Sequence, residues 1–299
     1  MKKQLLVGAA VLVLFGCAKE TPAPEPAAST EPAAQAQPSA SEKLDTILAA
    51  QPEETKARYA HRHPKEMLEF FGVEPGMTVV DTLPGDFWYT GLLLDYLGPE
   101  GKVIAADYSA EMWKQFGEYS PDPKEKVNWP ADYVAKIEPT RTDGDAAIAA
   151  FQYGSVPDDM AGTADVVLMV RAIHHFMRLE DKGGYMTKAL ADANKLLKPG
   201  GIVGVEQHRA PEGNSDKWAT GDQGYVKQSA VVAAFEKAGF ELVEESEINA
   251  NPKDKPTEKE FVWRLPPTLA TSQKDPALKA QMEAIGESDR MTLKFRKKA

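Results

Sequence analysis

Apolar runs recur along the chain and are separated by segments in which apolar residues follow helical spacing. Most of the runs are continuous rather than alternating, which is typical of strands buried on both faces of a parallel sheet. The predicted strands are "MTVVDT" at 77–82, "KVIAAD" at 102–107, the weaker "AAIAAF" at 146–151, "ADVVLMV" at 164–170, "GGIVGVEQH" at 200–208, "FELVEES" at 240–246 and "MTLKFR" at 291–296.

Helices are predicted between these strands. They cover "HPKEMLEFFG" at 63–72, "FWYTGLLLDYLG" at 87–98, "YMTKALADANKLLKPG" at 185–200 and "SAVVAAFEKAGF" at 229–240. Strands that alternate with helices of this length form βαβ units with right-handed crossovers. The pattern therefore predicts a doubly wound α/β fold, with residues 43–299 as a single domain.

Two regions depart from the alternation. Residues 119–144 are polar and interrupted by prolines, so they are predicted as a surface excursion. Residues 247–289 form a long insertion between the last two strands, and "VWRLPPTL" gives it aromatic and leucine side chains. Because long connections inside a domain are usually functional covers or disordered segments, this content favours an ordered lid.

The N-terminus has the pattern of an export signal. Lys2 and Lys3 precede the apolar run "LLVGAAVLVLFG", which ends at Cys17 and is too short for a permanent membrane span. "LFGC" resembles the lipobox of bacterial lipoproteins, which implies lipidation of Cys17, removal of residues 1–17 and, with Ala18 next, the outer membrane. An ordinary signal peptide with a chance cysteine is the alternative.

Residues 18–42 are rich in Ala, Pro and Glu and have no aromatic side chain. Such a segment buries too little apolar surface to offset its ordering entropy, so we expect a disordered tether. A lipidated cysteine, a tether and a folded body together predict a periplasmic protein anchored to the membrane.

Charge excludes one class of partner. The chain has a net charge of −10, and without the first 17 residues it has 33 basic against 45 acidic residues, or −12. Nucleic-acid binding requires a basic surface, so no nucleic-acid partner is expected. Since Cys17 is the only cysteine, the body has no disulfide.

The order of elements resembles class I S-adenosylmethionine-dependent methyltransferases. The resemblance lies in "GVEPGMTVVDTLPGDFWYTGLLLDYLGPEGKVIAADYS" at 72–109 and "LLKPGGIVGVEQHRA" at 196–210. More narrowly, "VRAIHH", "HRAPEG" and "IGESDRMTLKF" resemble a group of bacterial predicted methyltransferases, many of them exported. The resemblance covers about residues 55–299. It implies a Rossmann-like seven-stranded sheet with an antiparallel last strand, and S-adenosylmethionine as cofactor.

The loop after the first strand departs from the family motif, acidic-x-Gly-x-Gly-x-Gly. Asp81 holds the acidic position and Gly85 the second glycine, whereas Leu83 and Phe87 replace the other two and Pro84 removes an amide donor. Side chains there crowd a ligand that glycine would admit. The resemblance nevertheless implies cofactor contacts from Asp81, Leu83, Pro84 and Gly85.

The end of the second strand supplies the other cofactor marker. The resemblance implies that Asp107 bonds the ribose hydroxyls and that Tyr108 lies beside them. The alternative for Asp107 is an N-cap of the helix that begins near Ser109.

Titratable side chains gather at the predicted strand ends. The five histidines are His61, His63, His174, His175 and His208. One hypothesis makes His174 or His208 the general base, oriented by Glu206, with Arg171 or Asp81 positioning the cofactor.

Two further hypotheses remain for the histidines. His174, Glu206 and His208, with His61 or His63, could bind a divalent metal, although no local metal motif is present. Alternatively, one of the paired histidines, His175, serves only packing.

Two functions follow. The first is methyl transfer from S-adenosylmethionine to a small molecule, in which positioning does most of the work. The second is a small-ligand or metal-binding protein on the same scaffold that does not methylate. The altered loop favours the second function, as does an exported location, because the cofactor is made in the cytoplasm.

Overall fold

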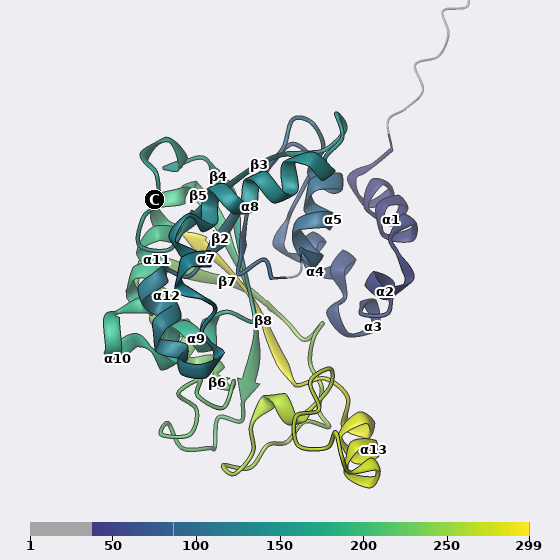
Figure 1. Cartoon of the computed structure of the whole chain (residues 1–299), viewed down its shortest axis with the longest axis vertical. Coiled ribbons are helices and arrows are strands. Elements are labelled where there is room, and N and C mark those ends of the chain that lie inside the picture. Colours follow the sequence, from purple (N-terminus) through teal and green to yellow (C-terminus); the bar gives the residue numbers. More distant parts are fainter. Residues whose placement is uncertain (1–37, 86, 299) are drawn as a thin grey trace, which may run out of the picture. The chain divides into compact units, whose positions relative to one another are not determined.

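A computed structural model describes residues 38–85 and 87–298, which form a mixed β-sheet covered by helices (Figure 1). The strands are β1 (Thr78–Thr82), β2 (Lys102–Asp107), β3 (Ala147–Gln152), β4 (Ala164–Val170), β5 (Leu197–Ala210), β6 (Val226–Lys227), β7 (Phe240–Ser246) and β8 (Arg290–Lys297). Their order is β3-β2-β1-β4-β5-β8-β7, and the two-residue β6 pairs with β5. The first five strands are parallel, and β8 is antiparallel to both of its neighbours.

This topology confirms the predicted Rossmann-like α/β fold with an antiparallel last strand. The helices are α1 (Ala40–Ala50), α2 (Glu53–Lys56), α3 (Tyr59–Arg62), α4 (Pro64–Phe71), α5 (Trp88–Leu97), α6 (Ala110–Trp113), α7 (Pro123–Val127), α8 (Trp129–Ile137), α9 (Ile173–Arg178), α10 (Glu180–Gly183), α11 (Tyr185–Leu196), α12 (Gln228–Lys237) and α13 (Pro276–Ile285). Short 3₁₀ turns lie at Lys114–Tyr119, Glu138–Thr140, Asp158–Met160 and Val262–Arg264.

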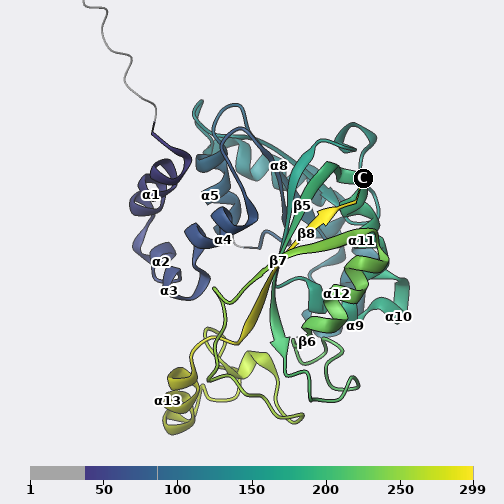
Figure 2. The same ribbon diagram turned by 180° about the vertical axis from the view of Figure 1, so that it is seen from behind.

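Two apolar layers bury the two faces of the sheet. Successive strand residues point to opposite faces, so Val79 contributes to one layer and Val80 to the other. Helices α1, α4, α5 and α8 complete the first layer, and α9, α11 and α12 complete the second (Figures 1 and 2). Burial on both faces explains why the strands read as continuous apolar runs.

The folded unit begins earlier than predicted. It starts at Pro38, and α1 begins at Ala40, inside the segment assigned to the tether. The cause is a capping box: the Ser39 side chain accepts a hydrogen bond from the Glu42 amide, and the Glu42 side chain accepts one from the Ser39 amide. The signal segment and Cys17 lie outside the described residues. Within the described ranges, no helix is long and apolar enough to cross a membrane.

The prediction of a surface excursion at 119–144 is wrong in part. This stretch contains α7 and α8, and Tyr133 and Ile137 of α8 are buried against the sheet. Pro130 lies in the first turn of α8, where proline supports a helix, so it does not interrupt the segment.

The insertion at 247–289 is ordered and packs on the body, beyond the carboxyl end of β5 (lower part of Figure 1). Its Val262 and Trp263 pack against Trp218 and Tyr225. The buried Arg264 guanidinium pairs with the Asp254 carboxylate at 2.9 Å. The predicted ordered segment is therefore present.

Candidate functional site

A pocket of about 500 Å³ opens where the strand order reverses, at the carboxyl ends of β1 and β4. Open α/β sheets bind ligands at this position. Its lining combines the loop after β1 with side chains from α2, α3, α5 and the end of β4. These residues are Glu54, Thr55, Arg58, Arg62, Asp81, Thr82, Leu83, Pro84, Gly85, Trp88, Tyr89, Val170 and Arg171. We call it the arginine pocket.

The loop after β1 is held in an uncommon backbone conformation. Leu83, Gly85 and Phe87 all have positive φ, at 57°, 52° and 63°. The Leu83 amide donates to the Ala106 carbonyl at 2.7 Å, so the turn is tied to β2. Leu83 packs partly against the core and also lines the arginine pocket. Non-glycine residues in this region cost free energy and are concentrated at functional sites.

Asp81 lies at the base of the arginine pocket. Its side chain is buried, and one carboxylate oxygen accepts a 2.6 Å hydrogen bond from the Thr90 hydroxyl. Burial raises the pKa of Asp81 to about 6, against the lowering effect of Thr90. The carboxylate is ionised at neutral pH, but burial makes its charged form less favourable. Shifted pKa values of this kind are concentrated at binding and catalytic sites.

A second pocket of about 480 Å³ lies on the other side of the same loop. We call it the aromatic pocket, because Phe87, Trp113, Trp129 and Tyr133 contribute to its lining. Leu83, Pro84 and Gly85 line both pockets, and Asp107 lines only the second.

Asp107 is at the predicted strand end but carries partners that the sequence did not predict. Its carboxylate accepts hydrogen bonds from the Tyr108 amide at 2.7 Å and Trp113 Nε1 at 3.1 Å, and Lys126 Nζ lies 2.7 Å away. Burial raises the pKa of Asp107, and Lys126 opposes this shift. The N-cap alternative is wrong, because the Ser109 side chain caps α6.

Tyr108 does not line either pocket through its side chain. The ring is completely buried, and its hydroxyl lies 2.9 Å from His175 Nδ1. The side chain of Tyr108 is therefore not placed to make the predicted cofactor contact. The same contact supports the packing role predicted for His175.

Three arginines face the arginine pocket. Arg171 directly follows β4 and has φ 55°, and its amide donates to the Glu206 carbonyl at 2.7 Å. Arg62 lies over the Trp88 ring, with 4.4 Å from guanidinium carbon to ring centroid. Burial and the nearby Arg171 and Arg58 lower the pKa of Arg62 to about 10, so it remains protonated at neutral pH. Arg58 was not predicted as a site residue.

Glu206 does not orient a histidine, contrary to prediction. It pairs with Arg290 of β8 at 3.0 Å, and both side chains are almost completely buried. Arg290 also pairs with Glu287 at 2.9 Å, and Glu287 reaches Arg58 at 2.9 Å. This network lies behind the pocket and fixes Arg58.

His174 and His208 lie together at the carboxyl ends of β4 and β5. His174 Nδ1 is 3.1 Å from Gln207 Oε1, so Gln207 takes the orienting role predicted for Glu206. The ring centroids of His174 and His208 are 5.5 Å apart, and His208 Nδ1 is 2.6 Å from Ser288 Oγ. Burial lowers the pKa of His174 to about 4 and that of His208 well below its usual value. Both imidazoles are neutral at neutral pH.

The metal hypothesis finds no support in residues 38–85 and 87–298, where no three His, Cys, Asp or Glu side chains are arranged as metal ligands. Two of the proposed ligands also have other partners. His63 Nδ1 lies 3.1 Å from Asn249 Oδ1, while Glu206 pairs with Arg290.

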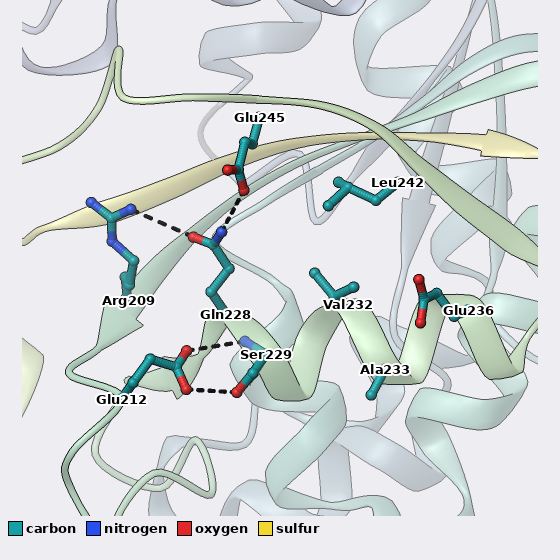
Figure 3. Close-up of a pocket in the computed structure, with 9 residues that line it drawn as sticks. All are labelled: Arg209, Glu212, Gln228, Ser229, Val232, Ala233, Glu236, Leu242 and Glu245. Carbon is teal, nitrogen blue, oxygen red and sulfur yellow. Dashed lines mark hydrogen bonds between the residues drawn. The ribbon is translucent and has the colours of Figure 1, made fainter.

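A third pocket lies away from the strand reversal, between α12 and β7 (Figure 3). Its polar groups satisfy one another: Gln228 donates to Glu245 at 2.7 Å, and Glu212 accepts from the Ser229 hydroxyl at 2.6 Å (Figure 3). It therefore offers few unpaired polar groups to a ligand.

No protein-family model matches the chain, and no curated protein matches it. Among solved structures, the chain is similar to the [4+2]-cyclase SpnF, with 16% identity, a TM-score of 0.51 and coverage of 80% of this chain and 81% of that one. A geranyl diphosphate C-methyltransferase from Streptomyces coelicolor shares 12% identity over 84% and 87% of the chains, with a TM-score of 0.49. A SAM-dependent methyltransferase from Aquifex aeolicus shares 19% identity over 70% and 93%, with a TM-score of 0.44.

The similarity to the cyclase agrees with the strand order: the fold is Rossmann-like, with a mixed sheet and an antiparallel final strand. At these identities the likeness concerns the fold alone. Because one fold hosts many reactions, function must be argued from the site.

Proposed function

We propose that this protein binds S-adenosylmethionine and transfers its methyl group to a small-molecule substrate. One observation carries the proposal. Asp81 near the end of β1 and Asp107 at the end of β2 each line a pocket, and the two pockets share the loop at Leu83–Gly85. A cofactor with an amino-acid end and a nucleoside end requires two such compartments joined at their centre.

The residues present fit the nucleoside end. Trp113 and Trp129 offer flat apolar surfaces to a purine. Asp107 offers carboxylate oxygens to the ribose hydroxyls, and Lys126 now neutralises that carboxylate. Ribose binding therefore exchanges part of an internal ion pair for hydrogen bonds to the ligand.

The residues also fit the amino-acid end. Arg171 has no acidic partner within 4.0 Å among the described residues, so its guanidinium can take a ligand carboxylate. Asp81 is ionised at neutral pH and can accept from an ammonium group.

The cofactor supplies an activated methyl group on a sulfonium centre. The protein's part is to fix the acceptor against that group and exclude water, since positioning accounts for most of the rate in such displacements. Where the acceptor is an O–H or N–H group, a proton must leave. We assign this proton to neutral His174, whose buried Nε2 has no hydrogen-bond partner among the described residues. Because the His174 ring lines neither pocket, the acceptor must extend from the pockets toward the start of α9.

A lipid anchor at Cys17 and a periplasmic location are part of this proposal. Their support is the charged start, the short apolar run and "LFGC". Labelled fatty acid should enter the full chain expressed in a Gram-negative bacterium and be lost in Cys17→Ser. Equal labelling of both proteins would show that Cys17 is not the lipidated residue and would reject the proposed anchor.

A second candidate is a small-ligand binding protein that does not methylate. The ion pair of Lys126 with Asp107 favours it, because this pair occupies the expected ribose contact. Calorimetric titration of the full chain with S-adenosylmethionine and S-adenosylhomocysteine separates the two functions.

We expect micromolar binding of both compounds, lost in Asp107→Asn and kept in the control Asp158→Asn, whose carboxylate is exposed and pairs with Lys195. Absence of binding to the unaltered chain would reject the methyltransferase proposal and leave the second candidate.

A further inference from the structure

Three buried hydrogen-bond donors of the arginine pocket have no acceptor among the residues that the structure describes. They are Arg58 Nε, Arg62 Nε and the Tyr89 hydroxyl. Buried donors are nearly always paired, because an unpaired one loses its hydrogen bonds to water without gaining others. Three in one pocket indicate that an acceptor group belongs there.

The charges of the pocket give the sign of that group. Arg58 shares Glu287 with Arg290, whereas Arg62 has no acidic partner within 4.0 Å among the described residues. The pocket also holds two acids, but Asp81 bonds Thr90 at the base and Glu54 is exposed at the rim. A cationic surplus therefore remains around Arg62.

The donors are held in place before any ligand arrives. Arg62 rests on the Trp88 ring, and Arg58 is fixed by Glu287. Burial raises the pKa of Tyr89, so its hydroxyl keeps its proton and can donate. A fixed set of donors favours a compact group with several lone pairs, such as a carboxylate or a phosphate.

We propose that Arg58, Arg62 and Tyr89 bind an oxyanion of the substrate, so that the methyl acceptor is an anionic small molecule. The identity of the anion as methyl acceptor rests on the proposed function, whereas the oxyanion site itself does not. Arg171 remains for the carboxylate of the cofactor. Since the chain has a net charge of −10, its surface as a whole does not attract anions, and binding of a simple anion reports on this pocket.

The test uses inorganic phosphate and malonate as probes, titrated calorimetrically into the full chain at neutral pH. We expect Arg62→Gln to weaken binding about tenfold or more, since it removes charge-assisted hydrogen bonds. Tyr89→Phe keeps the ring and should weaken binding a few-fold. The control is Arg296→Gln, which makes the same charge change at a half-exposed residue of β8 paired with Glu241. Whichever probe binds more tightly gives the class of oxyanion.

Repeating the titrations with saturating S-adenosylhomocysteine separates this inference from the proposed function. Binding of both ligands together, with the probe lost only in the pocket variants, supports an anionic substrate. Competition between them would mean that these arginines hold the cofactor carboxylate, which overturns the inference but not the function. Probe binding without S-adenosylhomocysteine binding leaves the oxyanion site and rejects methyl transfer. Equal probe binding in all variants, or none in the unaltered chain, overturns the oxyanion site.

Discussion

The Glu206 carboxylate lies 3.0 Å from Nε of Arg290, and each side chain is about 2–3% exposed. These residues belong to the antiparallel pair β5 and β8, so the ion pair joins the last strand to the parallel part of the sheet. Arg290 also donates to the His61 carbonyl, which ties the segment that carries Arg62 to the sheet. The geometry of the arginine pocket therefore depends on Arg290, a residue that does not line it.

Arg290→Met should destabilise the protein strongly. It leaves Glu206 without its cation and Glu287 with Arg58 alone, and breaking a buried ion pair costs about 3–5 kcal/mol. Urea unfolding measures the change. The control Arg296→Met, on the same strand but half-exposed, should cost about 0.5 kcal/mol. Equal losses of unfolding free energy in the two variants would contradict the stabilising role of the ion pairs that Arg290 makes with Glu206 and Glu287.

Asp81→Asn should stabilise the protein at neutral pH and weaken cofactor binding. The folded state raises the pKa of Asp81 from 3.8 to about 6, so it binds the proton more tightly than the unfolded chain does. The contribution of protonated Asp81 to the free energy of unfolding is fully present below pH 4 and is lost as pH rises through about 6. The penalty above that pH is about 3 kcal/mol, which asparagine avoids.

Denaturation of Asp81→Asn and the unaltered chain at pH 4.5 and 7.5 tests this sign. The advantage of the variant should be clearly larger at pH 7.5 than at pH 4.5, and the exposed Asp158→Asn should show no such gain. A variant that is less stable at pH 7.5 would show that ionised Asp81 is well solvated.

The sequence was sufficient to predict the fold and the positions of the strand ends. Strands buried on both faces need apolar residues at successive positions, so each strand appears as a continuous apolar run. The sequence placed Asp81, Asp107 and Arg171 correctly at the carboxyl edge of the sheet. It did not predict the role of Arg290, which depends on β8 lying beside β5 although 79 residues separate their nearest ends.

The directions of individual side chains were the other feature that the sequence did not predict. Tyr108 follows a marker aspartate, yet its ring turns into the core, because Phe176 and His175 pack around it. Arg58 was not singled out, although its spacing of four from Arg62 places the two arginines on one side of a short helical segment. That spacing, just before a predicted helix, is a signal that the sequence could have given.

His174 should stay neutral far below the usual pH of histidine titration. Burial lowers its pKa to about 4, so the unfolded chain binds the proton more readily and this group favours unfolding as pH falls from about 6.5 to 4. Nitrogen-15 NMR of the imidazole rings, assigned with His174→Gln, measures the titration directly. A His174 ring that titrates near pH 6.5 would mean that water reaches it and would weaken its role as a buried proton acceptor.

The insertion should open as a unit when Arg264 is replaced. The Arg264 guanidinium and the Tyr225 hydroxyl both bond the Asp254 carboxylate, at 2.9 and 2.8 Å, and Asp254 is buried. Arg264→Met leaves that carboxylate without its cation, a loss of about 3–5 kcal/mol, although methionine keeps much of the packing volume.

Because the insertion lies outside the sheet, we expect the cost to appear as local opening. Amide hydrogen exchange in 247–289 should accelerate about 100-fold or more, while β1 and β2 stay protected. The control Arg296→Met should leave both regions unchanged. If β1 and β2 also exchange faster in Arg264→Met, the insertion is part of the global folding unit and cannot act as a separate cover over His174, whose ring centroid lies 5.9 Å from that of Trp263.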